Sequence, residues 1–327
     1  MSANLTICPL KEISMKNHTN HLMNLTGIVV LVLAHSLLTQ AQKYSDWSAP
    51  VNLGPVVNSS GSETQMGISK NGLSLYLTSN RPGGLGSVDM YVSQRVSIDD
   101  PWGAPVNLGS TVNSSSGEAN PVFSRDGHLM FFQSDRPGGL GSIDIWVCRR
   151  EHTHDDFDWQ PPVNVGAPVN STASDNAPSY FENEEDGLPQ LYFASDRPGG
   201  AGGLDIYVSE QTADGSFGTP VRVTELNSIA GDTRPTIRHD GLEIFIQSNR
   251  AGTTGVADLW VSTRENTLDS WSTPVNVGIT VNTAFIEQNP FLSSDCKTLF
   301  FSSDRPGGIG SLDIYMSTRT KLRGNAN

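Results

Sequence analysis

Cysteine, positive charge and helical patterning are all scarce in this sequence. Only three cysteines occur in 327 residues, and Cys148 and Cys296 fall in different repeats, so we expect no disulfide. The 21 Lys and Arg against 34 Asp and Glu give a formal net charge of −13, which argues against nucleic acid and anionic membrane surfaces as partners. No apolar spacing of helical period competes with the strand patterns. The nucleophile elbow, the P-loop, HExxH and CxxC are missing too, and we expect neither a cofactor nor a bound metal.

What the sequence has instead is a repeat. The string SDRPGGLGSIDIWV, from Ser134, returns in similar form from Ser79, Ser195, Ser248 and Ser303. A second motif, an aromatic residue followed shortly by PVN or PVR, stands at Trp47, Trp102, Trp159, Phe217 and Trp271, with spacings of 55, 57, 58 and 54 residues. A period of this length indicates supersecondary units stacked side by side.

Each unit predicts four short strands. Strands two and three carry aromatic and β-branched residues, and Asn-Gly or Asp-Gly closes the first hairpin in four units of five. Proline falls in the first strand at Pro121, Pro178, Pro235 and Pro290, and in the fourth at Pro50, Pro105, Pro162, Pro220 and Pro274. Because proline cannot donate to a ladder, the first and fourth strands should be the edges of a four-stranded sheet. This arrangement is typical of a propeller blade.

The two ends of the repeat region predict a closed ring. The repeats begin with a fourth-strand motif at Trp47 and stop after a third strand, so the N-terminal strand should complete the last blade. We therefore predict an all-β, five-bladed β-propeller with four antiparallel strands per blade over residues 42–320, followed by a tail at 321–327. We expect it to be a monomer.

The N-terminal segment has the pattern of a signal peptide. Lys11 and Lys16 precede an apolar run that ends near Leu38, and Thr39 and Ala41 supply small residues for cleavage. We expect residues 1–41 to be removed on export, which predicts a periplasmic or extracellular protein without a membrane span in the mature chain.

Polar residues repeat on one face of the predicted ring. An acid opens every first strand: Glu63, Glu118, Asp175, Asp232 and Glu287. Five acids around one axis would make a cation site such as a calcium site. Alternatively each pairs with the arginine of its own blade tip: Arg81, Arg136, Arg197, Arg250 and Arg305. The counted hairpin register sets Glu118 opposite Asp135. A second aspartate, Asp89, Asp144, Asp205, Asp258 or Asp313, can accept N–H bonds from the glycine turn or bind the same arginine.

Blade four departs from the repeat and is the candidate binding region. Ala251 to Gly255, with Thr253 and Thr254, replaces PGGLG, and Arg234 stands where other blades carry Asn120, Ala177 and Asn289. An arginine near the channel can meet an anionic ligand or a partner's carboxylate, or simply pair with Asp232. We predict that Arg234, Thr253, Thr254 and the five acids line the channel-mouth face.

Two local motifs have competing interpretations. The string EHTHDDFD, from Glu151 to Asp158, can supply zinc ligands, but it lies on a variable loop without partners from other blades and favours a solvated loop. Asn-x-Ser/Thr sequons at Asn58, Asn113 and Asn170 either carry glycan or form turns.

The strings S-x-D-G, S-D-R and D-I-Y-V, as in SRDGHLMFFQSDRPGGLGSIDIWV, resemble the WD40-like repeats called PD40, found in TolB-like periplasmic propellers. The resemblance covers about residues 60–320 and implies a bacterial envelope location. We expect an exported, non-enzymatic scaffold that binds a protein or a cell-wall or outer-membrane component. The alternative is a glycoside hydrolase with carboxylates at the channel mouth, since five-bladed propellers also house glycosidases. A glycosidase needs two carboxylates in different environments, which five near-equivalent acids do not supply.

Overall fold

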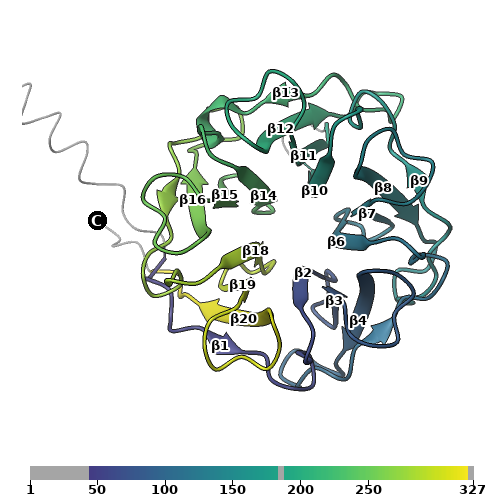
Figure 1. The fold of residues 1–327 in the computed structure, drawn as a ribbon, viewed down its shortest axis with the longest axis vertical. Helices are drawn as coiled ribbons and strands as arrows, with labels where there is room; N and C mark the ends of the chain where they lie inside the picture. Colours follow the sequence, from purple (N-terminus) through teal and green to yellow (C-terminus); the bar gives the residue numbers. More distant parts are fainter. Residues whose placement is uncertain (1–43, 183–187, 323–327) are drawn as a thin grey trace, which may run out of the picture. The chain divides into compact units, whose positions relative to one another are not determined.

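The computed structural model of this chain describes residues 44–182 and 188–322. The chain divides into two units, residues 46–320 and the two ends, 1–45 with 321–327. The first unit is a ring of five four-stranded antiparallel sheets (Figure 1), which confirms the predicted fold class. The predicted signal peptide, 1–41, lies outside the described residues. Within the described ranges, no helix is long and apolar enough to cross a membrane.

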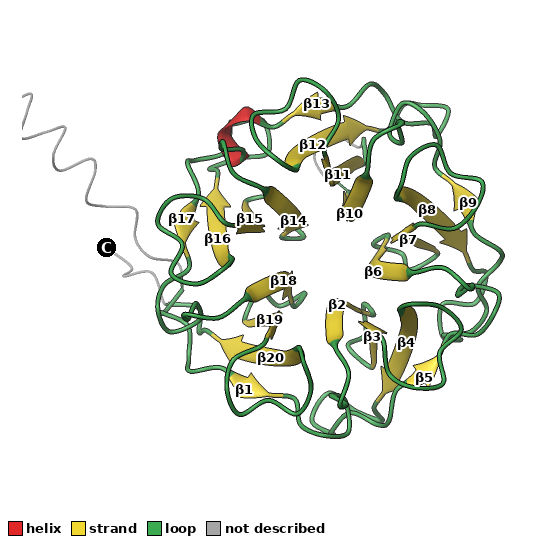
Figure 2. Ribbon diagram, viewed as in Figure 1, coloured by secondary structure: helices red, strands yellow, loops and turns green. Residues whose placement is uncertain are grey.

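In each blade the four strands lie side by side, with the first strand nearest the axis and the fourth strand at the rim (Figure 2). The first blade contains β2 (Glu63–Ile68), β3 (Ser74–Ser79), β4 (Asp89–Gln94) and β5 (Val106–Asn107). The second contains β6 (Glu118–Phe123), β7 (Leu129–Ser134), β8 (Asp144–Arg149) and β9 (Val163–Asn164). The third contains β10 (Asp175–Phe181), β11 (Gln190–Ser195), β12 (Asp205–Glu210) and β13 (Val221–Arg222).

A single turn of 3-10 helix, η1 (Thr224–Leu226), follows the third blade. The fourth blade contains β14 (Asp232–Ile237), β15 (Glu243–Ser248), β16 (Asp258–Thr263) and β17 (Val275–Asn276). The fifth contains β18 (Glu287–Leu292), β19 (Thr298–Ser303), β20 (Asp313–Thr318) and, from the other end of the unit, β1 (Val51–Asn52). Each outermost strand is only two residues long and begins directly after the proline of its fourth-strand motif, which cannot donate to a ladder.

The ring closes through the N-terminal strand, as the sequence predicts. Val51 pairs with Met316 and Asn52 with Tyr315 in antiparallel register. Before β1, Ser48 N donates to Thr318 O at 2.8 Å, and the Arg319 guanidinium lies 4.6 Å from the centre of the Trp47 ring. These contacts join the two ends of the ring without a disulfide.

Packing between blades supplies the hydrophobic core. The second strand of every blade buries a large aromatic side chain completely: Tyr76, Phe132, Phe193, Phe245 and Phe301. Each such residue contributes about 1.5–3 kcal/mol to stability when removed from water.

Every innermost strand contains a β-bulge at its third residue. That residue has a positive φ in each blade: Gln65, Asn120, Ala177, Arg234 and Asn289, at 25°, 64°, 51°, 54° and 56°. The pairing register shifts at the same place, for example between Ala119 and Val122. The bulge inserts one residue into the strand. Glu118 therefore pairs with Ser134 and not with Asp135, so the counted register was wrong by one residue.

Candidate functional site

The acids that open the innermost strands, here called the tip acids, are completely buried. Glu118 accepts hydrogen bonds from Ser114 N (2.7 Å), Ser114 Oγ (2.6 Å) and Ser134 Oγ (3.0 Å), and it lies 2.9 Å from Arg136 Nη2. Its equivalents Glu63, Asp175, Asp232 and Glu287 are 0% exposed and form ion pairs with Arg81, Arg197, Arg250 and Arg305. Since both oxygens of Glu118 already have donors, this carboxylate has no free oxygen for a cation or a substrate.

The second acid of the repeat holds the glycine loop. Asp144 accepts hydrogen bonds from Leu140 N (2.5 Å), Gly141 N (3.0 Å) and Asn164 Nδ2 (2.8 Å). The same loop bonds are made by Asp89, Asp205, Asp258 and Asp313. A Cβ on Gly141 would lie 1.7 Å from the carbonyl oxygen of Ala173 in the next connection, so this position tolerates only glycine.

The altered loop of blade four keeps this arrangement. Thr254 N donates to Asp258 Oδ2 at 2.8 Å, and Thr253 Oγ1 donates to Ser248 O at 3.2 Å. The residues that replace PGGLG in blade four therefore keep the hydrogen bonds of the blade tip. The structure gives Thr253 and Thr254 these tip contacts, and neither residue lines the pocket described below.

The histidine-rich loop connects two blades. Asp156 accepts hydrogen bonds from Ser74 Oγ (2.6 Å), Tyr76 OH (2.6 Å) and Gln94 Nε2 (2.7 Å) of the first blade. His152 Nδ1 lies 2.9 Å from Asp158 Oδ2 at the surface. In the part of the chain that the structure describes, no three His, Cys, Asp or Glu side chains converge as metal ligands.

The three sequon asparagines are buried. Asn113 accepts a hydrogen bond from Met90 N and donates to Met90 O, both at 2.9 Å, and it is 2% exposed. Asn58 and Asn170 make the equivalent pairs of bonds to Ile314 and Ile145. Because these amides are enclosed and bonded, they cannot carry glycan in the folded protein.

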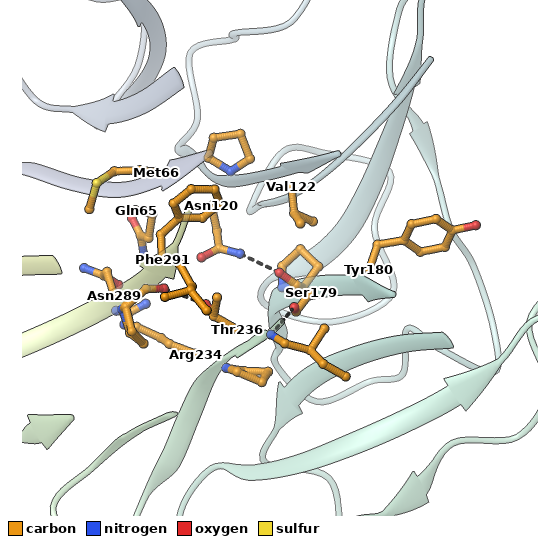
Figure 3. Close-up of a pocket in the computed structure, with 16 residues that line it drawn as sticks. Gln65, Met66, Asn120, Val122, Ser179, Tyr180, Arg234, Thr236, Asn289 and Phe291 are labelled. Atoms are coloured by element: carbon orange, nitrogen blue, oxygen red, sulfur yellow. Dashed lines mark hydrogen bonds between the residues drawn. The ribbon is translucent and has the colours of Figure 1, made fainter. Parts of the chain in front are cut away.

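A small pocket of about 70 Å³ lies on the ring axis between the five innermost strands (Figure 3). Its lining begins at the third residue of four of these strands and at the fourth residue of β10, and it extends toward the hairpin turns, away from the tip acids. Its lining comprises Gln65, Met66, Asn120, Pro121, Val122, Pro178, Ser179, Tyr180, Arg234, Pro235, Thr236, Ile237, Asn289, Pro290, Phe291 and Leu292. Four of the five positive-φ residues are among them, and we call those five residues the inner ring. None of the described lining residues is acidic.

Hydrogen bonds between blades hold the wall of this pocket. Asn120 Nδ2 donates to Pro178 O at 2.8 Å, and Ile237 N donates to Ser179 Oγ at 3.3 Å (Figure 3). Thr236 Oγ1 donates to Pro290 O at 2.5 Å. The pocket is therefore a preformed feature of the ring.

Arg234 is the one cation among the described lining residues. Its Nε donates to Gln247 Oε1 at 2.7 Å. Asp232 does not pair with it, because that carboxylate is bonded to Ser248 Oγ and Arg250 Nη2, both at 2.5 Å. Burial lowers the pKa of Arg234 to about 10, which leaves the guanidinium charged at neutral pH.

Asn289 enters the same pocket from the neighbouring blade (Figure 3). It is 3% exposed, and neither its Oδ1 nor its Nδ2 has a hydrogen-bond partner among the described residues. Buried polar side chains normally have such partners. The sequence shows Asn289 as a counterpart of Arg234, but its unpaired state depends on neighbouring blades.

No protein-family model and no curated protein matches this chain in sequence. Several solved structures share its fold. An α-L-arabinofuranosidase from Lactobacillus brevis is similar at a TM-score of 0.58 and 14% identity, covering 83% of this chain and 94% of that one. A GH62 hydrolase in complex with xylotriose is similar at 0.55 and 11%, covering 86% and 99%. A structure described as a glycoside hydrolase is similar at 0.59 and 8%, covering 87% and 94%. At these identities the similarity shows a shared five-bladed fold.

These comparisons correct two predictions made from the sequence. The resemblance to PD40 repeats and TolB-like propellers is contradicted, since no family model matches and the structural neighbours are glycoside hydrolases. The expectation of a non-enzymatic scaffold for a protein or envelope ligand is contradicted by the same neighbours. Both predictions were wrong because the repeat motifs encode blade tips, which stabilise a propeller without specifying its function.

Proposed function

We propose that this protein acts on carbohydrate and belongs functionally with the glycoside hydrolases that share its fold, with the axial pocket as the place where a saccharide binds. One observation carries the proposal: the pocket lies on the axis of a ring whose fold is shared with hydrolases of arabinose-containing and related substrates. An exported location, expected from residues 1–41, fits a protein that meets extracellular glycan.

The chemistry of the pocket supports sugar recognition. Amide and guanidinium groups of Asn120, Asn289 and Arg234 stand among the apolar surfaces of Met66 and Phe291. A few placed polar groups in an otherwise apolar concavity are typical of small-molecule sites. Such groups can donate hydrogen bonds to the polar groups of a sugar whose ring lies at the opening of this small pocket.

Hydrolysis would require two carboxylates in different environments. The tip acids cannot supply them, because Glu118 and its equivalents are buried and each is paired with an arginine. Asp126, in the turn between β6 and β7, and Glu182, directly after β10, do not line the pocket, but their charges act on Tyr180, which does. Burial, and after it the charges of Glu182 and Asp126, raise the pKa of that tyrosine. These two carboxylates are therefore the first to substitute if cleavage is observed.

The proposal is tested with two measurements on the full chain. Binding of xylotriose and arabinose-substituted xylo-oligosaccharides is measured by calorimetry, and release of 4-nitrophenol is followed from aryl α-L-arabinofuranosides and β-xylosides. We expect saccharide binding that is lost in Thr236→Phe, which fills the pocket, and retained in Thr219→Phe on an exposed loop. Absence of both binding and cleavage across the panel, or unchanged binding in Thr236→Phe, would contradict it.

If cleavage is observed, Asp126→Asn and Glu182→Gln are compared with Asp100→Asn, an exposed carboxylate elsewhere in the ring. Loss of turnover with retained binding in either of the first two variants would assign the catalytic acid or base. Full activity in both would show that the carboxylates lie elsewhere in the chain.

A further inference from the structure

We infer that the axial pocket binds the carboxylate of an acidic saccharide, a uronate, through the Arg234 guanidinium and the Asn289 amide. The inference deepens the proposed function and rests on it, since it specifies which saccharide the pocket would select.

Arg234 differs from the blade-tip arginines in its bonding partners. Each tip arginine forms an ion pair, for example Arg250 with Asp232 at 2.5 Å. Among the described residues, no carboxylate pairs with Arg234, whose side chain bonds to Gln247 through Nε. The Arg234 side chain is partly buried, and a charge that is withdrawn from water is normally paired. The missing counter-charge is most simply supplied by a ligand, because the protein's own acids near this strand are engaged elsewhere.

Asn289 provides the second, independent observation. Its amide is 3% exposed and lines the pocket, yet both of its polar atoms lack partners within the described ranges. A hydrogen-bond donor left unpaired beside a cation suits an anionic oxygen, which accepts from both groups. The inner-ring residues of the other blades carry no charge: Gln65, Asn120 and Ala177. The preference for an anion therefore depends on Arg234 of blade four and on the Asn289 amide of blade five.

The size of the pocket limits which chemical group of a ligand can enter it. A volume of about 70 Å³ holds only a few water-sized groups. A carboxylate fits such a space, and the sugar ring that bears it would remain at the opening. The planar fork of a guanidinium matches the two oxygens of a carboxylate, which favours a uronate over a neutral sugar.

The test uses trigalacturonate and its fully methyl-esterified form, which differ in charge but share the same sugar rings. Calorimetry on the full chain at neutral pH and low salt should show the acid binding at least about tenfold more tightly than the ester, as expected for hydrogen bonds to a charged group. Arg234→Gln should reduce the affinity for the acid to that for the ester. Arg149→Gln, which removes an exposed arginine of β8, is the matched charge control and should leave both affinities unchanged.

A second variant keeps the test decisive if Arg234→Gln fails to fold. Asn289→Asp places a carboxylate in the pocket that competes with the ligand for Arg234. It should abolish binding of trigalacturonate while the protein melts at or above the wild-type temperature. Retained binding in a folded Asn289→Asp protein would overturn the inference.

The remaining outcomes separate the inference from the proposed function. Equal affinity for acid and ester would overturn the uronate inference and leave saccharide binding intact. Binding of neither, together with no binding of neutral oligosaccharides, would overturn both. Acetate or inorganic phosphate binding as tightly as trigalacturonate would identify a simple anion site and overturn the assignment to a saccharide.

Discussion

Two sets of side chains surround the axis of this propeller, and they differ in how fully their polar groups are paired. The tip acids recur in all five blades, are fully buried, and are each bonded to an arginine and neighbouring hydroxyls. The inner ring varies from blade to blade and includes a cation and an amide that find, respectively, no acid and no hydrogen-bond partner among the described residues. Repeated, satisfied residues hold the blades together. The varied, unsatisfied residues are where a ligand can contribute binding energy.

The largest effect on the free energy of unfolding is expected from removing the arginine of a blade-tip ion pair. Arg136→Gln leaves the buried Glu118 carboxylate, 0% exposed, without its cation. Breaking a buried ion pair from one side typically costs about 3–5 kcal/mol, and we expect the free energy of unfolding to fall by about 3 kcal/mol. Urea unfolding followed by tryptophan fluorescence measures it, with Arg149→Gln as control. Equal stability of the two variants would contradict a structural role for the tip pair.

Asp156, a buried and hydrogen-bonded carboxylate outside the repeated motifs, should stabilise the fold as a tip acid does. Asp156→Ala removes the acceptor of three donors from the first blade and the partner of Arg150, which lies 3.4 Å away. Because buried donors are left unpaired, we expect a loss of about 2–3 kcal/mol. Glu151→Ala, an exposed neighbour, is the control. Chelator addition should leave the unfolding of the wild-type protein unchanged, and a chelator-sensitive midpoint would restore the metal interpretation of this loop.

The same chemical change at the inner ring should have a small or opposite effect on stability. Arg234→Gln removes a partly buried cation that pairs with no carboxylate among the described residues. We expect the free energy of unfolding to change by less than about 1 kcal/mol or to rise, because burying an unpaired charge is unfavourable. Urea unfolding beside Arg136→Gln gives a direct comparison. A loss as large as that of Arg136→Gln would show that Arg234 is structural.

The smallest effect is expected at the surface pair of His152 and Asp158. The hydrogen bond to Asp158, followed by its charge, raises the pKa of His152 above 6.5. A raised pKa in the folded state means that the pair stabilises the protein below pH 6.5, and that this contribution is lost as the pH rises through the folded-state pKa. His152→Ala should therefore lower Tm slightly at pH 5.5 and leave it unchanged at pH 8.5. A larger difference at pH 8.5 would contradict this sign.

Much of the ring could be predicted because its determinants are local. The repeat period gives the number of blades, proline at Pro121 and Pro105 marks the edges of a sheet, and the fourth-strand motif at Trp47 predicts closure with the last blade. The pairing of the tip acids with arginines of the same blade was also available as one of two interpretations. Apart from ring closure, which follows from the order of the motifs at the two ends of the repeat region, these features depend on neighbours within one repeat.

The bulge and the pocket could not be predicted in this way. The hairpin count placed Glu118 opposite Asp135, because a positive φ at Asn120 does not appear as a sequence pattern. Arg234 stood out as a departure from the repeat, and the sequence left its pairing with Asp232 open. The sequence named Asn289 only as a counterpart of Arg234, because the lack of partners for its amide among the described residues depends on how strands of different blades meet at the axis.

The sequence by itself therefore determined the number of blades, their edges and the closure of the ring, because hydrophobic alternation, proline and turn residues act over a few neighbouring positions. Only the tertiary structure decided which polar groups are satisfied. Whether Arg234 meets Asp232 or Gln247 depends on a one-residue bulge within the β14–β15 hairpin. Whether Asn289 finds a partner depends on the side chains that neighbouring blades bring to the pocket.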